Sequence, residues 1–512
     1  MENELLDKEV LCIIDVRQIQ KFLFHTNGPV ESLGASKVMS VILEDALEYA
    51  VKNIDTPLDK SQFDLSCSAD DKQIPYFHDE KILVQTIIIS AGNAFILFRT
   101  GRLCQKVIRK VSRYFLDKTH ILEISTCAVE KTDSNHKDVD AIFDKLDLVK
   151  NEFASAHPFL PPAIVKKEKN TGEAVFKILE NGKEISKSSF ILRQNVGPTD
   201  SMVDMKEIAS AKGPGGKSYV AIIHMDGNNM GSTIGQVVPK AKNYEESIII
   251  RRIIDRNITK GFNDTLKNTV DYIRKKYYPG ISDREFLHEL SFFHQGGDDI
   301  NLTCNPKIAI PFIERFVQEL RNVCLWKDDK SEVHFSVSAG IAFVYPDSNF
   351  FSAFNMAEEC CSNAKKFAKK PENAINGLSG TWFDFEFQTD RKILHLDIAR
   401  KRYFRTFENI NMQLRPYTLD AQMQDDIRHY DHLKKKMGTL QKIKLGKLKN
   451  YLLERSYSIG TVEFENFITK MALDGVNLKE MLGDPIIIDS DNERIATWYD
   501  AFVLNYFMKE EQ

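Results

Sequence analysis

In the first third of the chain, the order of apolar and polar residues predicts an alternation of short strands and longer helices. Segments rich in β-branched residues predict strands, and apolar residues that recur three or four positions apart predict helices. The predicted elements are a strand over 9–16, a helix over 31–52, a β-hairpin over 82–98, a helix over 101–118 and a strand over 121–129. Their order is β-α-β-β-α-β.

The same order returns in the second half of the chain. Its predicted elements are a strand over 218–226, a helix near 245–277, a hairpin over 288–304, a helix over 308–325 and a strand over 333–345. Two copies of β-α-β-β-α-β predict two ferredoxin-like domains, in each of which helices cover one face of an antiparallel sheet. Nucleotide polymerases and cyclases use this arrangement as their palm domain, so we expect an α+β fold with two palms.

Changes in composition divide the chain into four expected parts. Residues 150–216 contain Pro- and Gly-rich stretches that predict loops and short strands, and the chain becomes polar and helical after residue 390. Apolar residues at helical spacing in this last part predict a small helical domain: Leu433, Met437, Leu440, Leu445, Leu448 and Leu452. The expected parts are a first palm over 1–149, an inter-palm insertion over 150–216, a second palm over 217–389 and a C-terminal helical domain over 390–512.

Net charge, cysteine spacing and the length of apolar runs bear on nucleic-acid binding, on the redox state of the cysteines and on membrane contact. The 512 residues carry a formal net charge of −4, so no overall cationic field recruits nucleic acid. The basic stretch 432–449 is more typical of a solvated helix face than of an RNA site. The eight cysteines form no C-x-x-C pair, no signal peptide precedes them, and no apolar run approaches the roughly 20 residues that span a bilayer. We therefore expect a cytoplasmic protein with reduced cysteines and no membrane contact.

The hairpin of the second copy carries the sequence Gly-Gly-Asp-Asp at residues 296–299. The two glycines suit a tight turn and let phosphates approach the backbone, but the two adjacent carboxylates repel each other. Asp226 ends the neighbouring strand, so we expect all three carboxylates to converge. Mg²⁺ or Mn²⁺ ions between such hard oxygen ligands would relieve the repulsion, and a two-metal site of this kind catalyses nucleotidyl transfer.

Each of these features also has a plain structural explanation. A Gly-Gly-Asp-Asp turn by itself is as often a solvated hairpin tip as a site, and Asp226 by itself can cap a helix. Lys365 and Lys369 lie four positions apart on a helix over 356–370, which suits a solvated face and a triphosphate site equally well. The conjunction of a strand-end aspartate, the acidic hairpin and the repeated fold favours the catalytic interpretation.

The two copies differ in their acidic residues. Aligning them sets residues 92–94 (Gly-Asn-Ala) against residues 297–299 (Gly-Asp-Asp), and sets Asp15 against Asp226. Only the second copy keeps all the carboxylates. We therefore expect a degenerate first palm that binds a nucleotide without activating it.

Together these motifs resemble the large polymerase-like subunit of type III CRISPR effector complexes, over nearly the whole chain. The segments "IIDVRQIQKFLF" (13–24) and "SLGASKVMS" (32–40) are similar to the family's first-palm signature, and "DGNNMG" and "QGGDD" are similar to its catalytic strand and hairpin. The resemblance implies that Asp226, Asp298 and Asp299 are the catalytic residues, and that together with Gly227 they hold the metal. The nucleotide-binding residues that it implies are Gly34, Ala35 and Ser36 in a turn, and Gly227, Asn228, Asn229, Gly296, Gly297, Lys365 and Lys369.

Diguanylate cyclases are more distantly similar, through "VSAGIAF" and the "AEECCSNAKK" helix, although their hairpin normally carries Glu-Phe where this chain has Asp299 and Ile300.

Two features depart from the CRISPR family. A palm that begins near residue 9 leaves no room before it for the family's N-terminal His-Asp nuclease domain. The cysteine zinc site that is frequent in the family's insertion is not implied, because residues 150–216 contain no cysteine.

The resemblance implies a nucleotidyltransferase that converts ATP into cyclic or linear oligoadenylate messengers in prokaryotic antiviral defence. Two alternatives stay open: a non-catalytic, nucleotide-sensing scaffold of an RNA-guided complex, and a GTP-using cyclase, since Asn228 or Asn229 can contact either purine. The expected partners are nucleoside triphosphates, with guide or target RNA, small effector subunits and a second copy of the chain as further candidates.

Overall fold

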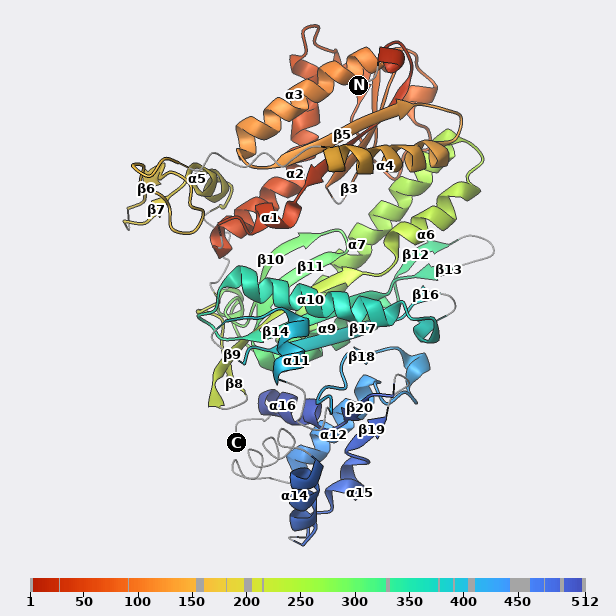
Figure 1. The fold of residues 1–512 in the computed structure, drawn as a ribbon. Coiled ribbons are helices and arrows are strands. Elements are labelled where there is room, and N and C mark those ends of the chain that lie inside the picture. The colour runs from red at the N-terminus through yellow and green to blue at the C-terminus, as the bar shows by residue number, and fades with distance from the viewer. Residues whose placement is uncertain are drawn as a thin grey trace.

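The structure of the chain is a computed structural model, drawn as a ribbon in Figure 1. It describes residues 3–26, 28–90, 92–152, 161–180, 182–197, 205–213, 216–327, 332–375, 378–389, 392–403, 410–442, 461–473, 475–488 and 492–508. Two palms and a mostly helical C-terminal part follow one another along the molecule (Figure 1). The expected α+β class with two ferredoxin-like palms is confirmed.

The first palm is built on a five-stranded sheet with the strand order β2-β3-β4-β1-β5. Its strands are β1 (Val10–Arg17), β2 (Phe63–Asp64), β3 (Val84–Ser90), β4 (Asn93–Phe98) and β5 (Glu123–Glu130), and its helices are α1 (Ile19–Leu23), α2 (Pro29–Asn53), α3 (Gly101–Thr119) and α4 (Asn135–Glu152). The central strand β1 is antiparallel to both of its neighbours, β4 and β5. Because alternate residues of a strand face opposite sides, β1 contributes to two apolar cores, one with α2 and α3 and one with α4.

The second palm repeats this order and extends it, with the strand order β10-β11-β9-β14-β17-β18 and β8 paired to β9. Its strands are β8 (Ala211–Lys212), β9 (Ser218–Gly227), β10 (Leu290–Gly296), β11 (Asp299–Cys304), β14 (Val337–Val344), β17 (Trp382–Phe387) and β18 (Tyr417–Thr418). Its helices are α6 (Met230–Val237), α7 (Tyr244–Tyr277), α8 (Asp283–Phe286), α9 (Pro306–Leu320) and α10 (Phe350–Ala368). Helices α7 and α9 pack on one face of the sheet and α10 packs on the other.

Two predicted boundaries in the second palm are wrong. The helix predicted over 308–325 ends at Leu320, and the next residues form β12 (Cys324–Lys327), which pairs with β13 (Glu332–His334). The strand predicted over 333–345 is divided for the same reason, since β13 belongs to this small hairpin and β14 to the main sheet. Apolar residues continue through all three elements, so the pattern alone does not show where the chain changes direction.

Strand β17 adds to the ferredoxin-like order by running parallel to β14. All its residues are buried, although two of them, Asp384 and Glu386, are acidic. Arg400 and Arg415 form ion pairs with both carboxylates, and this pairing offsets much of the cost of burying charge.

The strand registers correct the alignment of the two hairpins. Ser90 pairs with Asn93 in the first palm, and Gly296 pairs with Asp299 in the second, so each turn contains two residues. Residues 91–92 therefore correspond to residues 297–298, one position away from the expected alignment. Asn93 takes the place of Asp299.

The two palms share one apolar core. Phe24, which follows α1 of the first palm, stacks on Phe354 of α10 with ring centroids 4.3 Å apart and meets Phe293 of β10 edge to face at 6.2 Å. Val220 and Ile222 of β9 belong to the same core as residues of α2. Because Asp226 shares the strand face of these two residues, that face of the second palm is turned toward the first.

The inter-palm segment packs against the first palm through α5 (Lys187–Gln194), and it also contains the short strands β6 (Lys177–Ile178) and β7 (Glu184–Ile185). The C-terminal part contains α11 (Leu396–Tyr403), α12 (Tyr430–Lys442), α14 (Thr461–Leu473), α15 (Leu478–Leu482), α16 (Tyr499–Met508), β19 (Ile486–Ile488) and β20 (Arg494–Ala496). Leu433, Met437 and Leu440 are buried, as their spacing predicts. Leu445, Leu448, Leu452 and residues 443–449 of the basic stretch lie outside the described residues.

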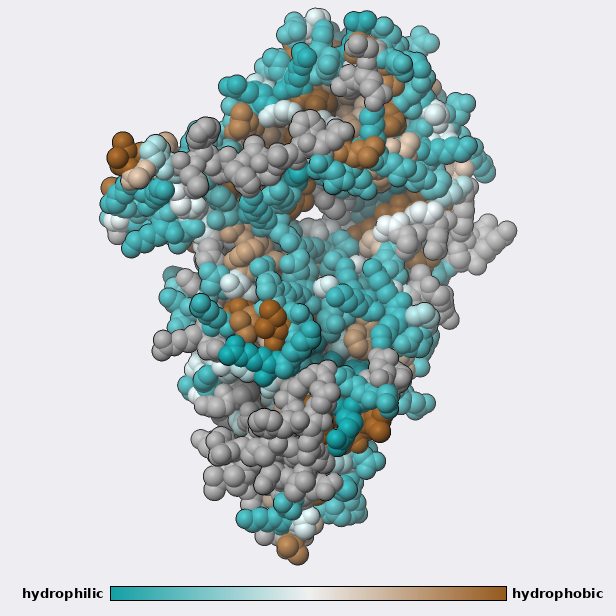
Figure 2. All heavy atoms as spheres, in the orientation of Figure 1, coloured by the Kyte–Doolittle hydropathy of each residue, from teal (hydrophilic) through white to brown (hydrophobic). Residues whose placement is uncertain are grey.

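All eight cysteines are free thiols, and six of them are buried, which agrees with the expected reduced state. The face of the molecule shown in Figure 2 is largely hydrophilic, with apolar residues scattered over it in small groups. None of the described helices combines the length and the apolar character that crossing a membrane would require.

Candidate functional site

Asp226 and Asp298 meet where β9 ends beside the turn between β10 and β11. Gly227 makes this approach possible, because a Cβ atom at Gly227 would lie 2.5 Å from Oδ2 of Asp298. Burial and the neighbouring charge of Asp226 raise the pKa of Asp298 to about 6. The structure thus brings two of the three predicted carboxylates together, and their mutual repulsion shows in the raised pKa.

The turn itself leaves its backbone open. Gly297 adopts a φ of +60°, which favours glycine, and no other atom lies within 4 Å of the position that its Cβ would take. Gly296 is exposed at the end of β10, with the His294 ring as its nearest neighbour. Both glycines therefore present main-chain atoms that a phosphate group can approach.

Lys365 of α10 also contacts the end of β9. Its ammonium forms an ion pair with Asp226 and also donates to the carbonyl oxygen of Gly227 at 3.2 Å. A cation therefore already lies against two of the oxygen atoms that the sequence assigns to a metal. Lys369 is exposed at the C-cap of the same helix and forms no ion pair with another described residue.

Asp299 is directed into a polar network instead of toward the other two carboxylates. Nδ2 of Asn301 donates to Oδ1 of Asp299 at 2.6 Å, and Nδ1 of the buried His224 lies 3.3 Å from the same oxygen. Burial would raise the pKa of Asp299, but hydrogen bonding to His224 and Asn301 and the charge of His224 lower it. Burial would likewise lower the pKa of His224, but hydrogen bonding to Asp299 holds it well above its ordinary value.

The expected convergence of three carboxylates is therefore only partly correct. Over the described ranges, no three His, Cys, Asp or Glu side chains are gathered as one group around a common metal position. Asp299 lies on the strand face that also carries Asn301, and this face meets the face of β9 that carries both His224 and Asp226. The contacts with Asn301 and His224, and not the strand face, therefore direct the Asp299 carboxylate into the polar network.

Asp226, Asp298 and the Gly227 carbonyl nevertheless fit a divalent ion. They supply only oxygen ligands, which Mg²⁺ and Mn²⁺ prefer. Burial and the charge of Asp226 raise the pKa of Asp298, so a further cation at this place would stabilise the ionised carboxylate. The Lys365 ammonium already bonds to Asp226 and Gly227, so a positive charge is stable there.

Ser36 of the first palm reaches this network across the boundary between the palms. Its Oγ lies 2.9 Å from Nδ1 of His294, and Nε2 of the same ring lies 3.7 Å from Oδ2 of Asp299. If the Ser36 hydroxyl donates to Nδ1, the proton of the ring is on Nε2 and points toward the carboxylate, which is the favourable arrangement of charge. The first palm is thus connected to an aspartate of the second.

The expected turn at residues 34–36 is wrong, because all three residues lie within helix α2. Gly34 packs against the inter-palm segment: a Cβ atom there would lie 2.0 Å from the carbonyl oxygen of Leu192 in α5. Ala35 is completely buried in the core. Of the three residues, Ser36 is the one whose side chain contacts the second palm.

The two asparagines after Asp226 bond to the protein. Asn228 is buried, its Nδ2 donates to the Gly380 carbonyl and its Oδ1 accepts from Ser338, each at 2.9 Å. Nδ2 of Asn229 donates to Ser379 at 2.6 Å. Their expected contact with a nucleotide base is therefore not supported, and both side chains instead fix the end of β9.

Sequence reasoning missed His224, His294 and Asn301. A signal for each was available, since each lies two residues from a predicted site residue and so on the same face of its strand: His224 from Asp226, His294 from Gly296, and Asn301 from Asp299. The contact between Ser36 and His294 had no such signal, because it joins residues that are 258 positions apart.

Comparison with known proteins places the second palm in a family. Residues 219–375 match the family model described as Cas10/Cmr2, second palm domain. No curated protein matches the chain. Similar solved structures include the apo Csm1-Csm4 cassette, with a TM-score of 0.49 and 10% identity over 99% of this chain and 71% of that one.

Two further structures are similar to a comparable degree. Csm1 in T. onnurineus aligns with a TM-score of 0.47 and 12% identity over 99% of this chain and 70% of that chain. The Csm1-Csm4 cassette in complex with cA4 aligns with a TM-score of 0.47 and 10% identity over 98% and 70%. The family match at residues 219–375 covers β9, the acidic hairpin and Lys365, and it confirms the resemblance to the large CRISPR subunit. Residues 219–375, which include most of the second palm, are therefore similar to the second palm domain of the Cas10/Cmr2 family.

Proposed function

We propose that the chain is a metal-dependent nucleotidyltransferase that joins ATP units into cyclic or linear oligoadenylate, as part of a prokaryotic antiviral defence of the CRISPR type. One observation carries this proposal: within a Cas10/Cmr2 palm, Asp226 and Asp298 meet beside an open glycine turn and a lysine. Carboxylates that can hold a metal, an accessible backbone and a lysine are what a triphosphate site needs.

The residues divide into three roles. Asp226, Asp298 and the Gly227 carbonyl would hold Mg²⁺ or Mn²⁺, which activates the attacking hydroxyl and neutralises the triphosphate when it is bound. Lys365 would leave Asp226 and bind phosphate oxygens instead, because its helix already directs the ammonium into the site. Gly296 and Gly297 would let the triphosphate lie against the main chain of the turn.

Asp299 would act with the network around it. Its hydrogen bonds to Asn301 and His224 fix the orientation of its carboxylate, and His294 approaches the other oxygen. The acceptor nucleotide would lie between the palms near Ser36, so that its ribose hydroxyl faces the donor held by the second palm. Holding two substrates in this way lowers the barrier by proximity and orientation.

The proposal is tested by incubating the purified protein with ATP and Mn²⁺, with and without target RNA, and identifying the products by mass spectrometry. We expect adenylate oligomers that carry 2′-5′ or 3′-5′ linkages, and none from Asp298→Asn. If the protein binds ATP but neither RNA nor metal yields a product, the proposed activity is wrong. Competition between ATP and GTP in the same assay separates an ATP-using enzyme from a GTP-using cyclase.

A nucleotide-sensing scaffold is the second candidate, and a specific observation favours it. Lys365 pairs with Asp226, and His224 and Asn301 hold Asp299, so two of the three carboxylates already have protein partners. This candidate predicts saturable ATP binding without turnover. In either case the Cas10/Cmr2 resemblance leads us to propose guide or target RNA and small effector subunits as partners, and co-purification checks this.

A further inference from the structure

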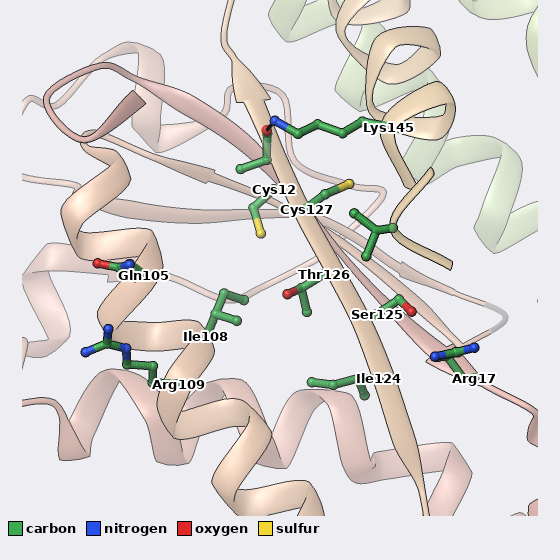
Figure 3. A pocket seen from close by; sticks show the side chains of 12 residues that line it. Cys12, Arg17, Gln105, Ile108, Arg109, Ile124, Ser125, Thr126, Cys127 and Lys145 are labelled. Carbon is green, nitrogen blue, oxygen red and sulfur yellow. Dashed lines mark hydrogen bonds between the residues drawn. The ribbon is translucent and has the colours of Figure 1, made fainter. Parts of the chain in front are cut away.

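A cavity of about 640 Å³ opens along the free edge of the first palm's sheet. Strand β5 is the last strand in the order β2-β3-β4-β1-β5, so it pairs with β1 on one side only. Residues 124–128 of β5 line the cavity, with side chains of α3 on one side and of α4 on the other (Figure 3). The cavity is therefore a groove beside an unpaired strand.

The free edge of β5 is only partly open, because Ser125, Cys127 and Ala128 are buried and Ile124 and Thr126 are half-buried. Nζ of Lys145 donates to the Ala128 carbonyl at 3.0 Å and covers one end of this edge. Ile124, Ser125 and Thr126 face the cavity nearer the other end. Unpaired edges of this kind pair readily with another chain unless a protein blocks them.

Two arginines stand at the open end of the groove. Arg17 ends β1 and Arg109 projects from α3, and Figure 3 shows them on opposite sides of β5. Neither guanidinium forms an ion pair or a hydrogen bond with any other residue that the structure describes. Apolar side chains form the walls between them, Ile108 and Ile124 on the α3 side and Val149 on the α4 side.

We propose that this groove binds an extended acidic segment of a partner protein, which adds to the first palm's sheet as a strand beside β5. A strand edge alternates N–H donors and carbonyl acceptors, and a polypeptide matches both, whereas the phosphate backbone of RNA supplies mainly acceptors. The two guanidinium groups suit an anionic partner, and on a polypeptide strand the matching groups are carboxylates, which arginine binds in bidentate pairs. Consecutive residues of a strand point to opposite faces, so two adjacent acidic residues in the partner would reach Arg17 and Arg109 at once.

The test measures fluorescence anisotropy of a labelled peptide on the full-length protein. The probe is a short peptide of alternating threonine and valine that ends in an Asp-Glu pair, and its counterpart ends in Asn-Gln. We expect saturable binding of the acidic peptide, at least about tenfold weaker binding of the amide peptide, and protection of the amides of residues 124–128 from hydrogen exchange. Binding of the acidic peptide should weaken at least about tenfold in the double variant Arg17→Gln, Arg109→Gln.

Arg113→Gln is the matched control, because Arg113 lies one turn further along α3, pairs with Asp117 and does not line the cavity. This variant should bind the acidic peptide as the unmodified protein does. The proposal is overturned by equal affinity for the acidic and amide peptides, by the absence of saturable binding, or by a loss in the control as large as in the double variant. It is also overturned if single-stranded RNA displaces the peptide and itself requires Arg17 and Arg109.

Discussion

The two palms place the same ion pair at the same point of the fold. In the first, Asp15 near the end of β1 pairs with Lys150 of α4 at 2.9 Å, and in the second, Asp226 near the end of β9 pairs with Lys365 of α10. Helices α4 and α10 each follow the last strand of the ferredoxin-like order. Each copy of the repeat therefore includes a seventh element, the helix α4 or α10. This helix carries a lysine that pairs with the aspartate of the central strand.

The palms differ in the charge around that pair. The first palm has Gly92 and Asn93 where the second has Asp298 and Asp299. Lys150 thus neutralises a single aspartate, whereas Lys365 faces more carboxylates than one ammonium can neutralise, and the pKa of Asp298 rises to about 6. The comparison teaches that the fold supplies the position, and that the additional carboxylates of the second palm distinguish it as the palm that we propose to bind metal.

The largest expected effect comes from removing that excess charge. Asp298→Asn together with Asp299→Asn makes the second hairpin resemble the first, so we expect weaker Mn²⁺ binding and a loss of turnover of about a thousandfold or more, because metal stabilisation of the transition state is worth several kcal/mol. Mn²⁺ binding followed by electron paramagnetic resonance and product formation are the two measurements. Turnover within tenfold of the unmodified protein would mean that the hairpin carboxylates are not the metal site.

The two lysines give the next comparison. Lys365→Met should lower kcat/KM for ATP by about 10- to 100-fold, because a charge-assisted hydrogen bond to a phosphate is worth about 1.5–3 kcal/mol. Lys150→Met removes the equivalent pair of the first palm and should change kcat/KM by less than about threefold. The measurement is steady-state kinetics with ATP. Equal losses of kcat/KM in the two variants would contradict the assignment of catalysis to the second palm alone.

A smaller effect is expected from the contact by which Ser36 of the first palm positions His294 of the second palm. His294→Asn should lower turnover by about tenfold, the low end of the cost of losing a residue that orients a side chain of the site, because the ring that approaches Asp299 and contacts Ser36 is lost. Ser36→Ala should act in the same direction with a smaller loss, and Ser36→Thr, which keeps the hydroxyl, should restore activity. If Ser36→Ala and Ser36→Thr behave alike, the hydroxyl does not position His294.

The smallest effect separates a tightly packed glycine, Gly34, from an open one, Gly438. Gly34→Ala forces a Cβ against the Leu192 carbonyl, so we expect the free energy of unfolding to fall by about 1–3 kcal/mol, the usual cost of overpacking. At Gly438 in α12 an added Cβ atom would meet no atom within 4 Å, so Gly438→Ala should raise the free energy of unfolding by up to about 1 kcal/mol. Denaturant titration measures both. A Gly34→Ala protein of unchanged stability would return Gly34 to the nucleotide-binding residues.

The sequence predicted most of the fold because the apolar pattern of each strand and helix is local. The hairpin of β10 and β11, the long helix α7 and the buried Leu433, Met437 and Leu440 are all confirmed. Strand β17 was not predicted as part of the sheet, because Asp384 and Glu386 are buried only by virtue of arginines from distant parts of the chain. Ion pairs between distant segments produce no periodic pattern of residues in the sequence from which such a strand could be predicted.

The candidate site was predicted to the same extent and for the same reason. Asp226, Asp298 and Lys365 follow from strand ends, a turn and a helix face, and the structure brings them together. The orientation of Asp299 depends on His224 of another strand, and the role of Gly34 depends on α5 of the inter-palm segment. Such contacts are decided by packing, so residue types alone did not reveal them.

The measurement that tests the asymmetry of the palms most directly is the initial rate of oligoadenylate formation by two matched variants, Asp226→Asn and Asp15→Asn. Each replaces the aspartate of a central strand that pairs with a lysine, and each keeps the size of the side chain. The account predicts that Asp226→Asn loses turnover by about a hundredfold or more, since it removes a metal ligand, while Asp15→Asn keeps at least about a third of the rate. Equal losses in the two variants would contradict the account and indicate that both palms are catalytic.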